Sequence, residues 1–530
     1  MTSVLAMGVL VAPAAFGVVA FGKLGSREAS VQRVKRMGVV ASWVGVLVAI
    51  VAAGTTSLHG LSESPTLGGN GLGVSVRLDA LSTVMFLMIT LLAVVIFRFS
   101  CTYLDGDERQ SVFLGRLAAT IAAVEVLVLS GNLAVLVGAW VATSLALHEL
   151  LVFYRDRPRA VIAARKKFIA ARTGDALLIA AAVLLYRQYD TGNLEKIFGG
   201  IRDTAKAGWS LNAVGVAALC LAFAALLKSA QFPTHGWLVE VMETPTPVSA
   251  LLHAGVLNAG PFLALRMAFV LNDAHLASSV LIVAGGFTAL FASVVLLTQP
   301  SVKVALGYSS AAHMGFMLMI CGIGVFPAAL LHLVAHSFYK AHAFLSSGSV
   351  IDDARADKVA IPLRLGSARR VTASLVVALG LYLVLAAAWR ANITDDPVVV
   401  LIGAILVLGT TQLVAPALDS TGGRRGTGRT ALLALAVTTS FFTLESGAHH
   451  VLASTVPEIG TRTGLELALF ATVVAVFATV VILQIFEPAR TKSRRRRALA
   501  IHLRNGLYAN ALYDRVVGAL RLPTPRAERV

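Results

Sequence analysis

Long apolar stretches recur from one end of the chain to the other, and short polar segments separate them. Most have about 17 residues or more, which an α-helix needs in order to cross the hydrocarbon core of a bilayer. About fifteen such windows can be counted. They lie near residues 3–22, 38–54, 80–98, 115–130, 132–153, 174–187, 210–230, 247–271, 277–298, 303–322, 325–348, 371–389, 398–416, 430–446 and 464–486. The pattern predicts an all-α polytopic membrane protein with about 14–15 transmembrane helices.

The composition points to the same class. Of the 530 residues, 57% are hydrophobic and only 14% are charged. A soluble domain has about 25% charged residues, because charges cover its surface. A soluble enzyme is therefore excluded.

Basic residues gather in the loops that follow odd-numbered spans. The stretch "RDRPRAVIAARKKFIAAR" (155–172) is expected to form the loop after the fifth span, and "RTKSRRRR" (490–497) follows the fifteenth. Even-numbered loops, such as 55–79 and 445–463, are poor in lysine and arginine. Because lysine and arginine concentrate in cytoplasmic loops, we expect an N-terminus outside and a C-terminus in the cytoplasm. The net charge of +17 then favours the lipid bilayer, and not nucleic acid, as the partner of these charges.

Cofactor motifs are not found in the sequence. Cys101, Cys220 and Cys321 stand alone without a CxxC spacing, so we expect no iron–sulfur or zinc site in this chain. The stretch "LGGNGLGV" (67–74) lacks the full glycine pattern and the βαβ context of a dinucleotide-binding loop. We therefore expect no cofactor in this chain and no enzymatic chemistry of its own.

Lys228 lies near the end of the seventh span and is followed by "SAQFP". A charge at the centre of a bilayer costs at least about 2.5 kcal/mol, so such residues usually face the interior of a helix bundle. Pro233 removes a backbone donor and breaks the helix, which can leave a hydrated gap beside the lysine. The alternative is a lysine that extends to the cytoplasmic headgroups.

The eighth span opens with Pro245 and Pro247 in "METPTPVSALLHAG", and His253 lies about two turns inside it. We expect both prolines to belong to the broken-helix region. A single histidine on an apolar face is either a core residue with satisfied hydrogen bonds or a member of a proton relay, and spacing alone leaves both open.

The eleventh span carries three ionisable residues in register. His332, His336 and Lys340 stand at i, i+4 and i+8 in "LLHLVAHSFYKAHAF", which places them along one face of a helix. Imidazole has an unperturbed pKa near 6.5 and exchanges protons near neutral pH, and the pKa of a buried lysine falls readily. We expect this face to carry protons or another cation.

Other ionisable residues are candidates for the same pathway. Lys303 and His313 flank the start of the tenth span, while Glu125 and Glu149 belong to the fourth and fifth spans. Each could be a relay member or an interior hydrogen-bond partner.

Two stretches resemble a known superfamily. "LLKSAQFPTHGWLVEVMETPTPVSALLHAG" (226–255) resembles the core signature of the antiporter-like proton-channel subunits of respiratory complex I and of multisubunit cation/proton antiporters. "LLHLVAHSFYKAHAFLSSGSVI" (330–351) is similar to their second signature. The resemblance covers about residues 75 to 350. It implies two inverted repeats of five helices, each with a broken helix, joined by a central polar axis.

The resemblance also implies roles and boundaries. The motif lysine is Lys228, and the central relay consists of His253, His332, His336 and Lys340. The implied regions are N-terminal helices over 1–114, a first repeat over 115–271, a second repeat over 272–416, C-terminal helices over 417–487 and a basic amphipathic cytoplasmic tail over 488–530.

The chain departs from the complex I pattern in its first repeat. The family has a glutamate after the tryptophan of the fifth span, but Val141 follows Trp140 here. The acidic partner of Lys228 is therefore missing at its usual place, and Glu149 or Glu125 could substitute for it.

A second departure concerns the second repeat. The sequence has no lysine between Lys358 and Lys492, so the second-repeat lysine of the family has no counterpart. Glu445, with His449 and His450, is the nearby ionisable candidate for the exit of the ion. These departures, and the stretch "WVATSLALHELLVFYRDRPRAVIAARKKFI" (140–169), make the chain most similar to the DabB family, the membrane subunits of two-component inorganic carbon accumulation systems.

The DabB resemblance implies a cation-conducting subunit, with protons as the expected ion, in the inner membrane of a bacterium. The expected partner is a DabA-like cytoplasmic zinc subunit that hydrates CO2 to bicarbonate. The alternative is a pumping subunit of a complex I type NADH-quinone oxidoreductase or of a Na+/H+ antiporter. The amphipathic tail, ending "NGLYANALYDRVVGALRLP", is expected either to lie on a surface or to dock the cytoplasmic partner.

Overall fold

Helices form nearly all of the described chain in the computed structural model. The structure describes residues 6–22, 31–205, 213–241, 244–348, 368–389, 397–419, 423–486 and 494–518. The N-terminal helices are α2 (Val11–Phe21), α3 (Val31–His59), α4 (Ala80–Tyr103) and α5 (Gln110–Val128). The central helices are α6 (Leu133–Leu151), α7 (Pro158–Tyr189), α8 (Leu194–Ala205), α9 (Ala213–Lys228), α10 (Gly236–Glu240), α11 (Thr246–Ala254), α12 (Ala259–Arg266), α13 (Ala268–Leu271), α14 (His275–Leu296), α15 (Val302–Ile323) and α16 (Phe326–Leu345).

The C-terminal helices are α18 (Ala368–Ala388), α19 (Pro397–Asp419), α20 (Gly423–Leu452), α21 (Gly464–Phe486), α22 (Arg494–Arg504) and α23 (Ala509–Val517). Short 3-10 turns are η2 (Val256–Asn258), η3 (Ser346–Gly348) and η4 (Gly506–Tyr508). Two small antiparallel hairpins complete the described elements: β1 (Ser62–Glu63) pairs with β4 (Arg77–Leu78), and β2 (Leu67–Gly69) pairs with β3 (Leu72–Val74).

Each of the predicted spans overlaps a helix, so the predicted all-α polytopic fold is confirmed. Ten described helical segments are long and apolar enough to cross a membrane. Helix α16 has 20 residues but is not among these ten, because it carries three histidines and a lysine. The helix with the most ionisable groups therefore depends on its neighbours to be stable in hydrocarbon.

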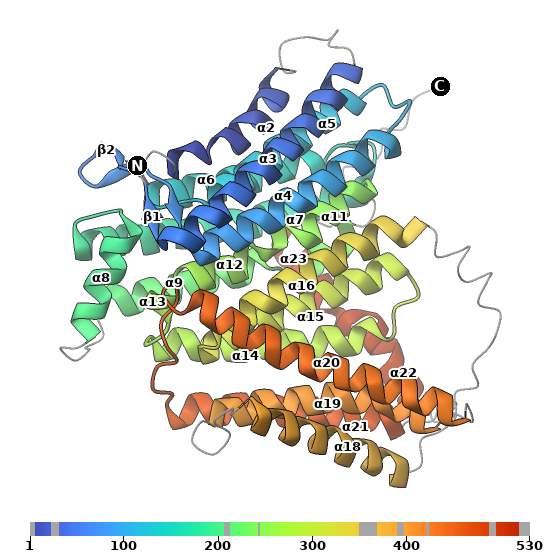
Figure 1. Cartoon of the computed structure of the whole chain (residues 1–530). Coiled ribbons are helices and arrows are strands. Elements are labelled where there is room, and N and C mark those ends of the chain that lie inside the picture. Colours follow the sequence, from blue (N-terminus) through green and yellow to red (C-terminus); the bar gives the residue numbers. More distant parts are fainter. Residues whose placement is uncertain are drawn as a thin grey trace, which may run out of the picture.

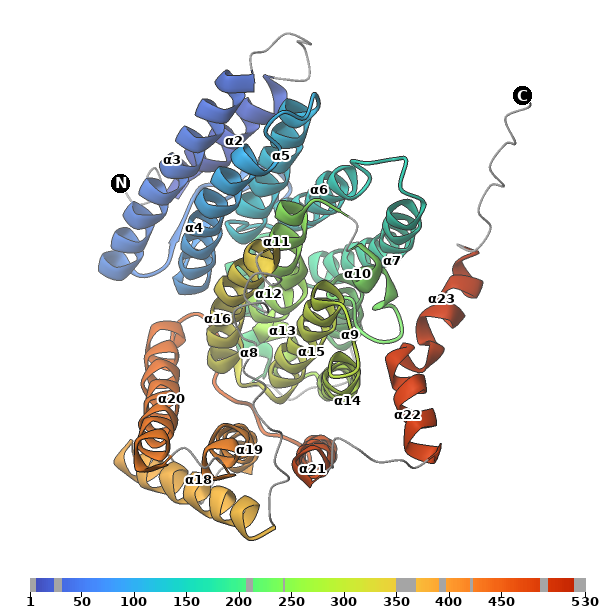
Figure 2. The same cartoon turned by 90° about the vertical axis from the view of Figure 1, so that its right-hand side faces the viewer.

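The helices form three groups along the bundle. Figure 2 shows α2–α5 on one side of the central group α6–α16 and α18–α21 on the other side. Figure 1 shows the β hairpins and α8 together at one end of the bundle. The division into repeats at 115–271 and 272–416 stays a prediction.

Helix α7 corrects the expected loop after the fifth span. Residues 158–172 of the basic stretch belong to this helix, and the loop is limited to residues 152–157. Pro158 stands in the first turn, where its fixed φ favours a helix start, and the alanines that follow favour helix. The basic residues interrupt the apolar window, so hydropathy alone places the helix start too late.

The broken-helix prolines lie in two different settings. Pro233 lies between α9 and α10, where it separates the two halves of the seventh span. Pro245 is the N-cap of α11 and Pro247 lies in its first turn, so both begin a helix instead of breaking one. The break in the eighth span comes later, at residues 255–258, where Gly255 and η2 separate α11 from α12. The sequence did not predict this second break.

Loops that follow even-numbered spans meet at one end of the bundle. Arg462 donates to the Asn272 carbonyl at 2.9 Å, which joins the loops after the eighth and fourteenth spans. At the other end, Gln299 donates to the Arg504 carbonyl at 3.1 Å, which joins the loop after the ninth span to the C-terminal segment. This alternation agrees with the order of spans, while the placement of the N-terminus outside stays a prediction.

A buried ion cluster closes the end of the bundle that carries the β hairpins. Asp79, the N-cap of α4, accepts from Arg77 Nε at 2.6 Å and from Arg266 Nη1 at 2.6 Å. Arg77 also pairs with Glu63 at 2.9 Å and Glu195 at 2.8 Å. The cluster thus ties β1, α4, α8 and the end of α12 together. It fixes the C-terminal half of the broken eighth span.

The two neighbouring arginines strongly stabilise the ionised form of Asp79. Burial alone would raise the pKa of its carboxyl, but Arg266 and Arg77 hold that pKa well below its usual range. A carboxylate with a lowered folded-state pKa stabilises the fold above its unfolded-state pKa, and this contribution is lost only as pH falls through the folded-state value. The cluster should therefore persist through the pH range in which ordinary carboxylates become protonated.

We expect Asp79→Asn to destabilise the fold strongly, because it leaves two buried guanidinium groups without their shared anion. Removing one partner of a buried ion pair costs about 3–5 kcal/mol. Thermal unfolding of the detergent-solubilised protein measures the loss. The control is Asp105→Asn, which removes an ion pair of 2.7 Å between Lys35 and a largely exposed aspartate and should cost about 0–1 kcal/mol. Equal shifts in the two variants would contradict the central role of the cluster.

Candidate functional site

Lys228 is the last residue of α9 and points into the protein. Its Nζ donates to the Trp140 carbonyl of α6 at 3.1 Å and lies 4.2 Å from the centre of the Trp140 ring. The side chain is buried. A lysine whose ammonium group extends to the lipid headgroups would be exposed. The burial of Lys228 therefore argues against this alternative.

The acidic neighbour of Lys228 is Asp175 on α7. Its charge acts on Lys228, and it also pairs with Arg172 at 2.7 Å. Asp175 is the one acidic residue in the apolar window 174–187, and this signal in the sequence was missed. The second neighbour is Lys167, whose Nζ donates to the Ser144 carbonyl at 2.6 Å and whose charge interacts with Lys228. We call Trp140, Lys167, Asp175 and Lys228 the Lys228 centre.

Neither glutamate suggested as the partner of Lys228 takes that place. Glu149 pairs with Arg116 at 2.8 Å, and its side chain is 46% exposed. Glu125 is fully buried on α5, and its Oε1 lies near Gly45 of α3. Its two carboxylate oxygens have no hydrogen-bond partner within the described part of the chain. The hypothesis that Glu149 or Glu125 takes the place of the missing acidic partner of Lys228 was therefore wrong for both residues.

A second cluster forms around α16. His332, His336 and Lys340 turn toward α15 and α11, and His313 of α15 joins them. His313 Nδ1 and His332 Nε2 are 2.8 Å apart, so one donates to the other. The rings of His313 and His336 have centres 4.9 Å apart. Lys340 is fully buried and donates to the Leu306 carbonyl at 3.3 Å.

His253 completes the group, which we call the histidine cluster (His253, His313, His332, His336 and Lys340). It is fully buried on α11 and stacks on Phe344 with 4.3 Å between ring centres. It lies close enough to Lys340 and His336 for their charges to interact. Both ring nitrogens of His253 and of His336 are buried without a hydrogen-bond partner among the described residues. The cluster thus has free donor and acceptor positions inside the bundle.

Polar contacts through the break of the eighth span connect the two clusters. Ser229, the residue after Lys228, donates to the Leu257 carbonyl at 3.1 Å. The next residue, Asn258, donates to Ser337 Oγ at 2.7 Å, and Ser337 follows His336 on α16. We call this sequence of contacts the polar seam. It runs from Ser229 through η2 to Ser337, which are the chain neighbours of Lys228 and His336.

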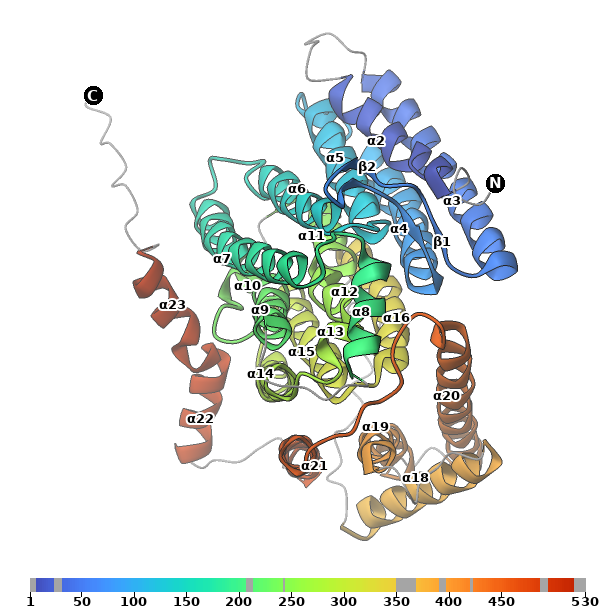
Figure 3. The same cartoon turned by 90° about the vertical axis from the view of Figure 1, so that its left-hand side faces the viewer.

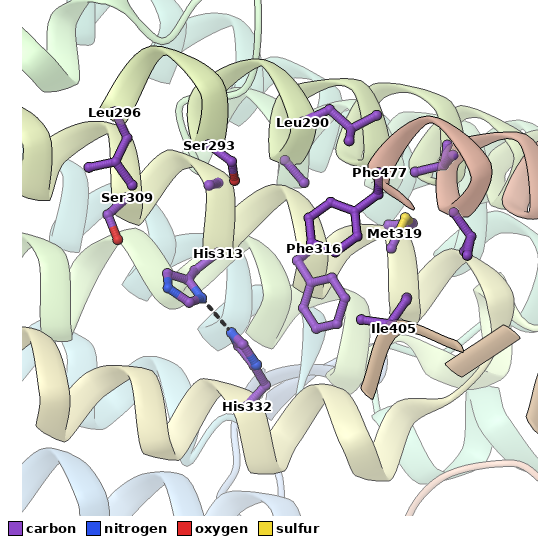
Figure 4. A pocket seen from close by; sticks show the side chains of 14 residues that line it. Leu290, Ser293, Leu296, Ser309, His313, Phe316, Met319, His332, Ile405 and Phe477 are labelled. Carbon is purple, nitrogen blue, oxygen red and sulfur yellow. Dashed lines mark hydrogen bonds between the residues drawn. The ribbon is translucent and has the colours of Figure 1, made fainter. Parts of the chain in front are cut away.

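A cavity of about 250 Å³ opens beside the histidine cluster. His313 and His332 form one wall, and Ser293 and Ser309 lie nearby, as Figure 4 shows. The other lining residues are apolar and come from α14, α15, α19 and α21. Water requires two to four polar partners in such a space, so only the histidine end of the cavity suits it.

The remaining candidates, Lys303 and Glu445, lie outside the Lys228 centre and the histidine cluster. Lys303 donates to Thr246 Oγ1 at 3.1 Å and so joins the starts of α15 and α11. Glu445 is half-buried on α20, which packs beside α16, and its charge interacts with His449. Among the described contacts, none joins Glu445 to the histidine cluster.

His235 is a buried histidine that sequence reasoning did not select. It lies between α9 and α10 and packs against Phe232, Phe291 and Tyr308. Within the described chain neither ring nitrogen has a hydrogen-bond partner. The sequence "FPTHGW" contains the signal, because this histidine directly follows the helix break.

In the described ranges, no group of three or more histidine, cysteine, aspartate or glutamate side chains could hold a metal ion.

Two family models match the chain. The model described as "NADH:quinone oxidoreductase/Mrp antiporter, TM" covers residues 130–388. The model described as "NADH-Ubiquinone oxidoreductase (complex I), chain 5 N-terminus" covers residues 66–114. The range of the first model includes every residue of both clusters.

A solved structure shows the same fold. The structure described as "Structure of Mrp complex from Dietzia sp. DQ12-45-1b" contains a chain that matches 96% of this one, with a TM-score of 0.57 and 22% sequence identity. The match covers 56% of that chain.

Two curated relatives are more similar in sequence. "Probable inorganic carbon transporter subunit DabB" of Hydrogenovibrio crunogenus is 42% identical over 289 residues, which is 54% of either chain. "Probable inorganic carbon transporter subunit DabB2" of Halothiobacillus neapolitanus is 40% identical over 454 residues, which is 84% of this chain and 80% of that protein. With that identity over most of both sequences, and with the matching antiporter-like models, the chain belongs to the DabB family of inorganic carbon transporter subunits.

Proposed function

We propose that this chain conducts protons through the membrane as one subunit of a two-component complex that accumulates inorganic carbon. The second component is a DabA-like cytoplasmic subunit whose zinc site hydrates CO2 to bicarbonate. Proton flow through this chain drives that hydration in one direction. The N-terminus lies outside and the C-terminus in the cytoplasm, in the inner membrane of a bacterium.

The observation that carries the proposal is the polar seam between the Lys228 centre and the histidine cluster. Ionisable groups in hydrocarbon are costly and mark ion pathways when they face one another. Here two buried lysines and four histidines lie at the two ends of a polar seam that passes through a helix break. The hydrogen bond between His313 and His332 is of the kind along which a proton can move between two imidazoles.

The membrane potential supplies enough energy for the proposed coupling. One charge that crosses 100 mV releases about 2.3 kcal/mol, and each 1.4 kcal/mol changes an equilibrium about tenfold. One proton per turnover would therefore shift CO2 hydration more than about tenfold. The direction of flow follows from the gradient that bacteria maintain across this membrane.

The partner is proposed because the relatives are named as transporter subunits. We assign the zinc and the hydration reaction to that partner. The alternative is a pumping subunit of a complex I type oxidoreductase or of a Na+/H+ antiporter, which the descriptions of the family models favour. Copurification decides between them: a large soluble zinc protein supports the proposal, and quinone-oxidoreductase subunits support the alternative.

Lys340→Ala and His336→Ala should each abolish function, because each removes one step of the histidine cluster. The measurement is growth in air of a host without carbonic anhydrase that expresses the chain with its partner. His342→Ala is the matched control on the same helix, since His342 is exposed, and it should retain growth. Membrane fractions should contain equal amounts of all variants. Growth of a Lys228→Ala/Lys340→Ala double variant would refute the assigned pathway.

Asp175→Asn should reduce growth in the same host at least about tenfold, because it removes the negative charge beside the buried Lys228. Glu149→Gln is the control, since Glu149 pairs with Arg116 at the surface, and surface ion pairs contribute about 0–1 kcal/mol. A Glu149→Gln variant that fails while Asp175→Asn grows normally would show that Glu149 is the functional acid.

A further inference from the structure

The C-terminal segment packs against the chain's own cytoplasmic end. Helices α22 and α23 lie along the side of the bundle formed by α7, α10 and α14, as Figure 3 shows. Gly506, between the two helices, has a φ of +58°, and a Cβ there would lie 2.9 Å from the Tyr308 hydroxyl. The backbone thus turns closely over α15. This places α23 over the short helix α10.

Lys166 of α7 is the centre of this contact. Its side chain is fully buried and pairs with Glu240 of α10 at 2.6 Å and with Asp514 of α23. Its Nζ also donates to Asn510 Oδ1 at 3.1 Å. The ammonium thus donates hydrogen bonds to Glu240 and Asn510 and forms an ion pair with Asp514. Two of these three partners come from α23.

Asn510 brings the two helices into close contact. Its Nδ2 donates to Glu240 Oε1 at 2.5 Å. A Cβ added to Gly236 would lie 1.7 Å from Asn510 Oδ1, so the position needs glycine. Tyr513 adds a hydrogen bond from its hydroxyl to the Lys166 carbonyl at 3.2 Å. The contact therefore fits side chains of α23 onto the backbone of both α7 and α10.

The contact adjoins the Lys228 centre on two sides. Helix α10 is the second half of the span that breaks after Lys228. On α7, Lys167 follows Lys166 and turns the other way, to Ser144 and toward Lys228. Both elements that α23 holds therefore continue directly into that centre.

We propose that α23 is a clamp on the broken seventh span: Asp514 and Asn510 act as positioning residues that hold Lys166 and Glu240, and thereby α10, where the ion pathway at Lys228 requires them. The inference rests on the proposed function, in which Lys228 belongs to the pathway. It goes beyond that function because it makes conduction depend on a segment outside the membrane spans. A C-terminal segment that only lies on lipid would leave α10 independent of Asp514.

The first test measures the position of α10 without reference to transport. In the full chain, Cys101, Cys220 and Cys321 are changed to alanine, and Val239→Cys places one thiol on α10. Labelling by a membrane-impermeant maleimide then reports the exposure of α10. Asp514→Asn removes one of the two carboxylates that pair with the buried Lys166 and should speed labelling about tenfold. Arg515→Gln, at an exposed neighbour on α23, should leave the rate unchanged.

The second test measures proton conduction by the same variants in vesicles, as the dissipation of an imposed pH gradient. Asp514→Asn and Lys166→Met should each slow it about tenfold or more at equal amounts of inserted protein. The double variant Lys166→Asp/Asp514→Lys keeps one cation among the carboxylates and should restore both conduction and slow labelling. Asp514→Glu should restore conduction in part.

Unchanged labelling in Asp514→Asn would overturn the clamp, and so would faster labelling with undiminished conduction. A wild-type chain that conducts no protons would instead overturn the proposed function and, with it, the positioning role. In that case the labelling experiment would still decide whether α23 holds α10.

Discussion

A lysine ammonium inside a bilayer needs hydrogen-bond acceptors that lipid does not supply. In this protein the acceptors are backbone carbonyls of neighbouring helices: Lys228 donates to Trp140, Lys167 to Ser144 and Lys340 to Leu306. A helix carbonyl has a second lone pair beyond its intrahelical bond, so it can accept from a lysine without breaking the helix. These bonds hold the lysines without neutralising them by a carboxylate at contact distance. The packing of α6, α9, α15 and α16 depends on this arrangement.

Lys166 differs from these lysines because side-chain carboxylates, and not backbone carbonyls, bind its ammonium group. It is as buried as its neighbour Lys167, yet two carboxylates and an amide surround it. A lysine bound in this way is fixed, whereas a lysine on a carbonyl can change its partner. Adjacent residues of α7 thus have different surroundings: Lys166 joins α7 to α10 and α23, whereas Lys167 faces Ser144 and the Lys228 centre.

The sequence predicted the spans well, because an apolar stretch of sufficient length has few alternatives to a transmembrane helix. The register of His332, His336 and Lys340 followed from the helical period, and His313 was among the candidates. The structure revealed contacts between helices that helical periodicity and hydropathy do not predict. Asp175 reaches Lys228 from another helix, and the break at Gly255 depends on backbone packing against α9 and α16. The basic half of α7 was taken for a loop because its charges face protein partners that the sequence does not identify.

The hydrogen bond between His313 and His332 has a further consequence for turnover. If a proton passes along two imidazoles in contact, each ring ends with its N–H on the side from which the proton came, and the pair cannot accept a second proton in the same direction until both rings rotate. The cavity beside them gives these rings free volume in an otherwise close-packed interior. Successive transfers would then alternate with ring flips, and a bulkier residue at Ser293 or Ser309 would slow the reset without removing any titratable group.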